Sequence, residues 1–165
     1  MTDEKRVFAF TMAFKGLANK LLSDVIIISG DQEVNVKAQW DTGATGSCIS
    51  HDVVSKLGLL PTGKKVVQTP SGNGEVNTYL VNIKLPNNVR VNDVEVCDSE
   101  IGNQGIGMLI GMDILNLGDF ALSNYKGQTV FSFRVPSTKK TDYVQEINKE
   151  LLIGPRHGKG KRKHK

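Results

Sequence analysis

Short apolar runs separated by glycine-containing turns are the feature of this sequence that most restricts its fold. The chain has 165 residues and 17 glycines, more than the usual glycine share of about 7%. Frequent glycine favours turns and short strands over long helices. Val34, Val36 and Ala38 alternate with polar residues, which is the two-residue period of a half-buried strand. The sequence therefore predicts a mainly β domain.

A hairpin is predicted in the middle of the chain. Val66 and Val67 precede a cluster of turn-forming residues at 70–74, and a second strand-like run follows at 76–83. The segment 15–22 is expected to form a helical turn. Other strand-like runs, the last two of them a second predicted hairpin, lie at 7–14, 24–29, 91–96, 120–124 and 128–133.

Two helices are predicted outside the strands. Ser50 is a suitable N-cap for a short helix at 51–57, and Gly58 is placed to end it. Thr141 is expected to cap a second helix near the C-terminus. An apolar stripe on this helix is expected to pack on the body of the chain or on a partner chain; it consists of Tyr143, Val144, Ile147 and Leu151.

The distribution of charge divides the chain unevenly. Its net charge is +4, but the last ten residues contain six of the 21 Lys and Arg and no acid. The remaining 15 bases face 17 acids, so the body is slightly acidic. A solvated tail is the preferred reading of the last ten residues, and contact with nucleic acid is the alternative. The predicted divisions are an extension at 1–30, the main domain at 31–135, a helical extension at 136–155 and a basic disordered tail at 156–165.

Composition also bears on location and cofactors. The sequence has no apolar run of about 18 residues, as a membrane-spanning helix requires. Its first ten residues, MTDEKRVFAF, lack the apolar core and cleavage site of a signal peptide. We therefore expect a soluble, cytoplasmic protein in which Cys48 and Cys97 are reduced. Ligand spacings typical of zinc sites do not occur, and no cofactor is implied.

Three motifs follow one another in a fixed order. Asp41-Thr42-Gly43-Ala44 comes directly after the alternating strand, and the glycine-rich hairpin begins about 30 residues later. The apolar pair Leu109-Ile110 and Gly111 then lead into a short helix. In this order, residues 31–135 resemble the retropepsin-like aspartic proteases. The resemblance implies a closed β-barrel-like acid protease fold, one or two short helices besides the C-terminal one, and a flap that closes over substrate.

The resemblance also implies roles for individual residues. Asp41 is the expected catalytic acid. Thr42 is expected to bond across a two-fold axis, Gly43 to bring a backbone N–H to the carboxylates, and Ala44 to leave room for substrate. Leu109, Ile110 and Gly111 are expected to support this loop, and Asp113 to cap a helix. The expected flap residues are Pro70, Ser71, Gly72, Asn73 and Gly74.

The need for two carboxyl groups in peptide hydrolysis determines the oligomeric state that we predict. One group must activate water while another protonates the substrate carbonyl, and two carboxylates that share one proton do both. The chain has a single Asp-Thr-Gly, so the second aspartate must come from a symmetric copy. The sequence thus predicts an aspartic endopeptidase that is active as a homodimer on polypeptides. The alternative is a catalytically silent peptide-binding or dimerisation module of the same fold.

Overall fold

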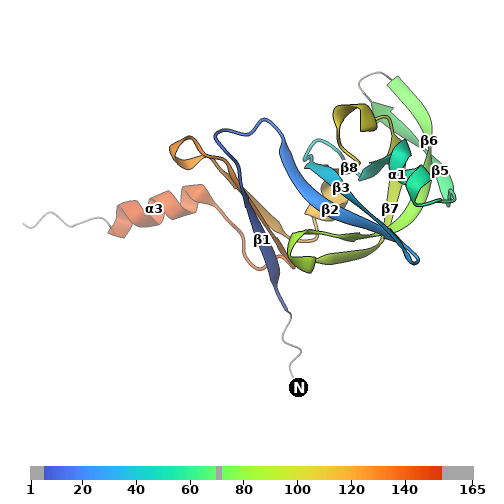
Figure 1. Ribbon diagram of the computed structural model, residues 1–165. Coiled ribbons are helices and arrows are strands. Elements are labelled where there is room, and N and C mark those ends of the chain that lie inside the picture. Colours follow the sequence, from blue (N-terminus) through green and yellow to red (C-terminus); the bar gives the residue numbers. More distant parts are fainter. Residues whose placement is uncertain (1–5, 70–71, 154–165) are drawn as a thin grey trace, which may run out of the picture.

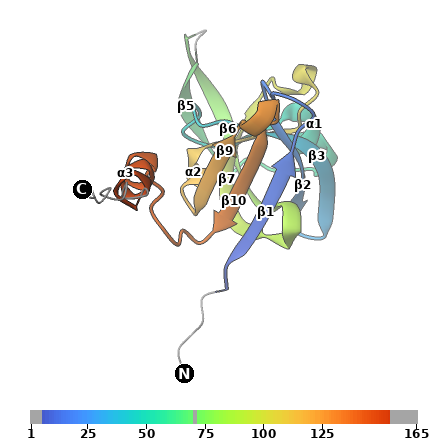
Figure 2. The same cartoon turned by 90° about the vertical axis from the view of Figure 1, so that its left-hand side faces the viewer.

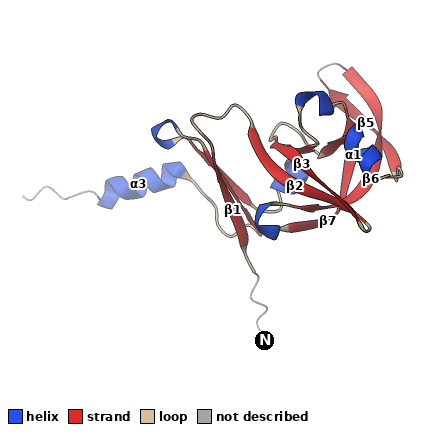
Figure 3. Cartoon of the chain, viewed as in Figure 1, coloured by secondary structure: helices blue, strands red, loops and turns tan. Residues whose placement is uncertain are grey.

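The computed structural model describes residues 6–69 and 72–153, and strands dominate them (Figure 3). Among these residues the strands form two sheets, the larger of which closes on itself. The mainly β, closed barrel-like fold predicted from the sequence is confirmed. The basic tail at 156–165, Pro70 and Ser71 lie outside the described residues.

The barrel closes because its first and sixth strands pair. Ile27 of the first strand lies opposite Ile83 of the last. Both side chains are fully buried, as the two-residue alternation of each strand requires. A further strand, β5 (Gly63–Thr69), pairs with the free edge of the sixth strand, β6 (Gly72–Lys84). Around the barrel the strands are β2 (Leu21–Ser29), β3 (Gln32–Trp40), β8 (Met108–Ile110), β4 (Cys48–Ser50), β7 (Arg90–Ser99) and β6 (Gly72–Lys84).

The smaller sheet joins the two ends of the chain. Its strands lie in the order β1 (Phe8–Ala13), β10 (Val130–Val135) and β9 (Asp119–Ser123) (Figure 2). The β1 strand runs antiparallel to β10, so residues more than 110 positions apart are neighbours. The β9–β10 pairing confirms the second predicted hairpin. This sheet contributes Phe10 and the buried side chains of β10 to the same core as the barrel.

Trp40 joins the barrel to the smaller sheet. Its ring centroid lies 5.1 Å from that of Phe131, 5.3 Å from Phe133 and 5.7 Å from Phe10. The indole N–H donates a hydrogen bond of 3.0 Å to the hydroxyl of Ser23. Trp40 is only 5% exposed. Its side chain therefore belongs to the core between the barrel and the smaller sheet.

The helix predicted after Ser50 is confirmed as α1 (His51–Lys56). The Ser50 hydroxyl accepts a hydrogen bond of 3.4 Å from the Val53 N–H, and Gly58 adopts a left-handed φ of +57°. The helical turn expected at 15–22 is wrong, since the end of that segment already belongs to β2. The short helix after β8 is α2 (Met112–Leu115), and single 3₁₀ turns are η1 (Pro86–Asn88), η2 (Gly102–Gln104) and η3 (Tyr125–Gly127).

The C-terminal helix is α3 (Tyr143–Ile153), and it stands away from the barrel (Figure 1). Asp142 caps it by accepting a hydrogen bond of 3.1 Å from the Gln145 N–H, so the prediction of Thr141 as the cap is wrong. The side chains of the apolar stripe are between 56% and 75% exposed, and the expected packing on the body of the chain is not found. Within residues 6–69 and 72–153, no helix is both long and apolar enough to cross a membrane.

The structure also bears on the predicted divisions of the chain. The β2 strand falls inside the N-terminal extension at 1–30, yet it pairs with both β3 and β6 in the barrel. The β1 strand of the same extension pairs with β10, which lies inside the main domain at 31–135. The boundaries remain a prediction, and the contacts add β1 and β2 to the folded unit.

Candidate active site

The Asp41 loop begins where β3 ends. Trp40 pairs in parallel with Ile110 of β8, and the Asp41 N–H donates a hydrogen bond of 2.9 Å to the Ile110 carbonyl. The chain then turns, and the Gly43 N–H donates to Asp41 Oδ1 at 2.8 Å. A Cβ on residue 43 would lie 3.2 Å from this oxygen, so glycine permits the close approach. Asp41 is half-buried, whereas Thr42 and Gly43 are exposed.

A buried serine fixes the other end of this loop. Ser47 is completely buried, and its N–H and hydroxyl donate to the two carboxylate oxygens of Asp113, at 3.0 and 2.8 Å. The Gly111 N–H donates to the same hydroxyl at 3.0 Å. Asp113 lies in the first turn of α2, whose N-cap is Gly111. The sequence predicted that Asp113 caps a helix, but the N-cap of α2 is Gly111. Asp113 instead accepts the hydrogen bonds from Ser47 that hold the Asp41 loop.

The segment after β8 packs directly beneath the loop. The Met112 N–H donates a hydrogen bond of 2.8 Å to the Ala44 carbonyl. A Cβ on Gly111 would lie 2.6 Å from the Gly46 carbonyl oxygen and 3.0 Å from that of Ala44. Only glycine fits between these backbone atoms without displacing them. Such contacts agree with the supporting role predicted for Leu109, Ile110 and Gly111, which remains a prediction.

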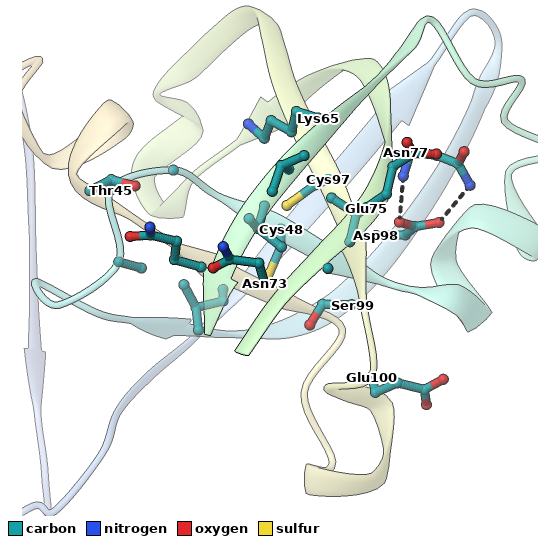
Figure 4. Close-up of a pocket in the computed structure, with 18 of the residues that line it drawn as sticks. Thr45, Cys48, Lys65, Asn73, Glu75, Asn77, Cys97, Asp98, Ser99 and Glu100 are labelled. Atoms are coloured by element: carbon teal, nitrogen blue, oxygen red, sulfur yellow. Dashed lines mark hydrogen bonds between the residues drawn. The ribbon is translucent and has the colours of Figure 1, made fainter. Parts of the chain in front are cut away.

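A groove of about 1300 Å³ runs between the loop and the β5–β6 hairpin. It is bounded by the loop at 43–46, by the hairpin at 65–68 and 72–77, and by the end of β7 (Figure 4). Among the predicted site residues of the described chain, Asp41, Thr42, Ile110 and Gly111 do not line it. Those that line it are Gly43, Ala44, Gly72, Asn73, Gly74 and Leu109.

The sequence analysis missed a buried carboxylate at the base of the hairpin. Asp98 is 9% exposed and accepts hydrogen bonds from the Asn77 N–H at 3.1 Å and from its side-chain amide at 3.2 Å (Figure 4). The Tyr79 hydroxyl donates a third hydrogen bond to it at 3.2 Å. Burial and the negative charge of Asp98 raise the pKa of Tyr79. Asp98 lies two residues after Val96 and points to the same inward face of β7 as Val94 and Val96. An acid at an inward position of a strand is the sequence signal that could have identified it.

Other groove residues also escaped the sequence analysis. Lys65 lies on β5, with its Nζ 3.6 Å from Glu95 Oε1 of β7. Cys48 and Cys97 line the same wall. Their joint position follows from the pairing of β4 with β7, which residue spacing does not reveal. In the part of the chain that the structure describes, no three His, Cys, Asp or Glu side chains are grouped so as to hold a metal ion.

Comparison with known families places this site in context. The sequence model of the aspartyl protease family matches residues 26–114, which is more than half of the chain. The chain therefore belongs to the aspartyl protease family, with a retropepsin-like fold. The matched region contains β3, the Asp41 loop, the hairpin and the β8–α2 segment as far as Ile114. No curated protein sequence matches the chain significantly.

Several solved structures are similar to this chain. A retropepsin-like aspartic protease from Rickettsia conorii is 16% identical with a TM-score of 0.51, and the match covers 79% of this chain and 96% of that one. The EIAV protease complexed with the inhibitor HBY-793 is 21% identical with a TM-score of 0.47, over 62% and 90% of the two chains. The protease of simian foamy virus (mac) is also 21% identical, with a TM-score of 0.43 over 58% and 91%.

Proposed function

We propose that this protein is an aspartic endopeptidase whose active site is completed by a second copy of the chain. One observation carries the proposal: a single Asp-Thr-Gly loop, fixed at both ends, leaves its aspartate half-buried next to a groove of peptide-binding size. Two such loops facing each other across a two-fold axis supply the pair of carboxylates that hydrolysis requires. The exposed Thr42 is then the residue that bonds across the axis.

Chemistry in the dimer uses the two Asp41 carboxyl groups, which share one proton at about 3 Å. The ionised group takes a proton from water, and the oxygen of that water attacks the peptide carbonyl carbon. The protonated group gives its proton to the carbonyl oxygen. Collapse of the resulting diol, with a proton delivered to the amide nitrogen, breaks the C–N bond. The Gly43 N–H stabilises the ionised carboxylate during these steps.

Substrate binds as an extended strand in the groove, with the β5–β6 hairpin as the flap. The flap consists of Pro70, Ser71, Gly72, Asn73 and Gly74, of which the last three line the groove. A main-chain N–H or a polar side chain of this segment contacts the peptide. The catalytic unit is the predicted domain at 31–135 together with β1 and β2, and polypeptides are the substrate class.

Replacement of Asp41 by asparagine tests the proposal. The D41N chain keeps the size of the side chain but cannot share a proton, so cleavage of a peptide library falls at least ~100-fold. Asp31→Asn, an exposed acid in the β2–β3 turn, is the matched control and keeps wild-type activity. Circular dichroism and sedimentation check that both variants keep the fold and the dimer, as we expect.

Two results would overturn the proposal. Cleavage by the D41N chain at the wild-type rate removes Asp41 from the mechanism. A wild-type chain that binds peptides but cleaves none of the library between pH 4 and 7 favours the silent peptide-binding module instead.

A further inference from the structure

Two cysteines meet in the wall of the groove. Cys48 of β4 and Cys97 of β7 are register partners in a parallel ladder, and both line the groove as free thiols (Figure 4). Cα atoms of neighbouring strands lie about 4.8 Å apart, within the range of about 4.4–6.8 Å that a disulfide spans. Cys48 is 8% exposed, and Cys97 is half-buried. The pair is therefore close enough to bond, with Cys97 the more accessible member.

The surroundings of the pair give the two thiols different pKa values. A hydrogen bond from the Cys48 thiol, together with the Lys65 ammonium, lowers the pKa of Cys97 to about 7, against the opposing effects of burial and of Asp98. The same hydrogen bond and burial raise the pKa of Cys48. Cys97 is therefore the thiol that ionises first as the pH rises, while Cys48 keeps its proton. Other ionisable groups on this side are Glu95, which is ion-paired with Lys65, and the groove-lining residues His51, Glu75 and Glu100.

We infer that Cys48 and Cys97 form a dithiol site that reacts with hydroperoxides. The Cys97 thiolate attacks one peroxide oxygen, the O–O bond breaks, and the leaving oxygen is protonated to water or an alcohol. Cys97 becomes a sulfenic acid. Cys48 then loses its proton and attacks the Cys97 sulfur, so that an S–S bond forms and water leaves. Overall the two thiols lose two hydrogens, and one hydroperoxide is reduced.

Oxidation changes the surface that faces substrate. The disulfide ties β4, which directly follows the Asp41 loop, to β7, and it removes the thiolate that faces Lys65 on the hairpin. We expect the oxidised protein to bind peptides more weakly. This consequence rests on the proposed function, whereas the thiol chemistry does not. The chemistry is therefore tested on the D41N chain as well, where proteolysis plays no part.

Mass spectrometry of the full chain after treatment with hydrogen peroxide at pH 7 tests the inference. The expected product has lost two hydrogens, yields a Cys48–Cys97 linked peptide and returns to the starting mass with dithiothreitol. Cys48→Ser stops at the sulfenic acid, which dimedone traps. In the Cys97→Ser variant, we expect the remaining Cys48 to react with hydrogen peroxide at least ~10-fold more slowly than Cys97 does in the Cys48→Ser variant. A wild-type chain that forms no such linkage, or that oxidises first at Cys48, overturns the inference.

Alkylation by iodoacetamide tests the role of Lys65. The rate at Cys97 follows the thiolate, so it rises with pH and reaches its half-maximum near pH 7 in the wild-type chain. Lys65→Gln moves this midpoint to higher pH because the stabilising cation is lost. Lys64→Gln is the matched control, since Lys64 pairs with Glu75 at 2.6 Å on the same hairpin, and it leaves the midpoint unchanged. A wild-type midpoint at the ordinary cysteine value of about 8.5 contradicts the inference.

Discussion

The Asp41 loop at 41–47 and the β5–β6 hairpin face the same groove but are held in different ways. The loop is bonded to three parts of the β8–α2 segment: the Ile110 carbonyl, the Met112 N–H and the Asp113 carboxylate. At the tip of the hairpin, β5 and β6 pair with each other but not with β7, because the ladder between β6 and β7 begins only at Thr78. The difference matches the two tasks proposed for them, because a catalytic acid must be fixed and a flap must open to admit substrate.

Removing the Asp113 carboxylate is the strongest test of the fixed half of this comparison. Asp113→Ala leaves the N–H and hydroxyl of the buried Ser47 without their charged acceptor. The free energy of unfolding falls by about 3 kcal/mol, and peptide cleavage falls with it because Asp41 is no longer held. Urea denaturation and kcat measure the two effects. Asp31→Ala is the control; if it is equally damaging, the loop has no special anchor.

A matched pair of glycine substitutions compares the two regions directly. Gly111→Ala places a Cβ against the carbonyl oxygens of Gly46 and Ala44, and we expect a loss of about 2 kcal/mol. Gly74→Ala on the hairpin meets nothing within 4 Å and leaves stability unchanged. The midpoints of urea denaturation distinguish them. Equal losses in both variants would show that the hairpin is packed as tightly as the loop.

Strain introduced at the hairpin tip stays local. Gly72 has a φ of +121°, which other residues adopt at a cost of about 1–3 kcal/mol. In Gly72→Ala the hairpin relieves this strain by opening, so its amide hydrogens exchange faster with solvent while the global midpoint of unfolding hardly moves. Hydrogen exchange read by mass spectrometry follows β5 and β6 separately from the barrel. Faster exchange throughout the barrel contradicts the separation of the two regions.

The smallest effect is expected from an exposed hairpin side chain. Val66 is 68% exposed and lines the groove. Val66→Ser changes the free energy of unfolding by less than about 0.5 kcal/mol, whereas KM for peptides rises because an apolar contact with substrate is lost. A KM equal to that of the wild-type chain would remove this part of the hairpin from the substrate site.

Local signals explain what the sequence could predict of the fold. Strand alternation, the Ser50 cap and the cluster of turn residues at 70–74 are decided by neighbours in the chain, and they predicted the hairpins and α1. The closure of the barrel by β2 and β6, and the pairing of β1 with β10, join distant segments and left no local mark. The helical turn expected at 15–22 failed because β2 extends into that segment.

For the candidate site, too, the sequence predicted the features that lie in continuous motifs and missed those that join distant segments. The Asp-Thr-Gly motif and the apolar segment ending at Gly111 could be read as one unit by resemblance. The bond between Ser47 and Asp113 spans 66 positions, and the meeting of Cys48 with Cys97 depends on a parallel ladder. Neither follows from residue spacing. Asp98 was the exception, since an acid on the inward face of β7 was visible in the sequence.

Active-site titration with a tight-binding inhibitor of aspartic proteases, combined with sedimentation of the same sample, tests the central claim most directly. If each copy contributes half a site, activity disappears at one inhibitor per two chains, and dilution that separates the chains abolishes cleavage. Complete inhibition only at one inhibitor per chain, or full activity in a sample that sediments as a monomer, contradicts the account.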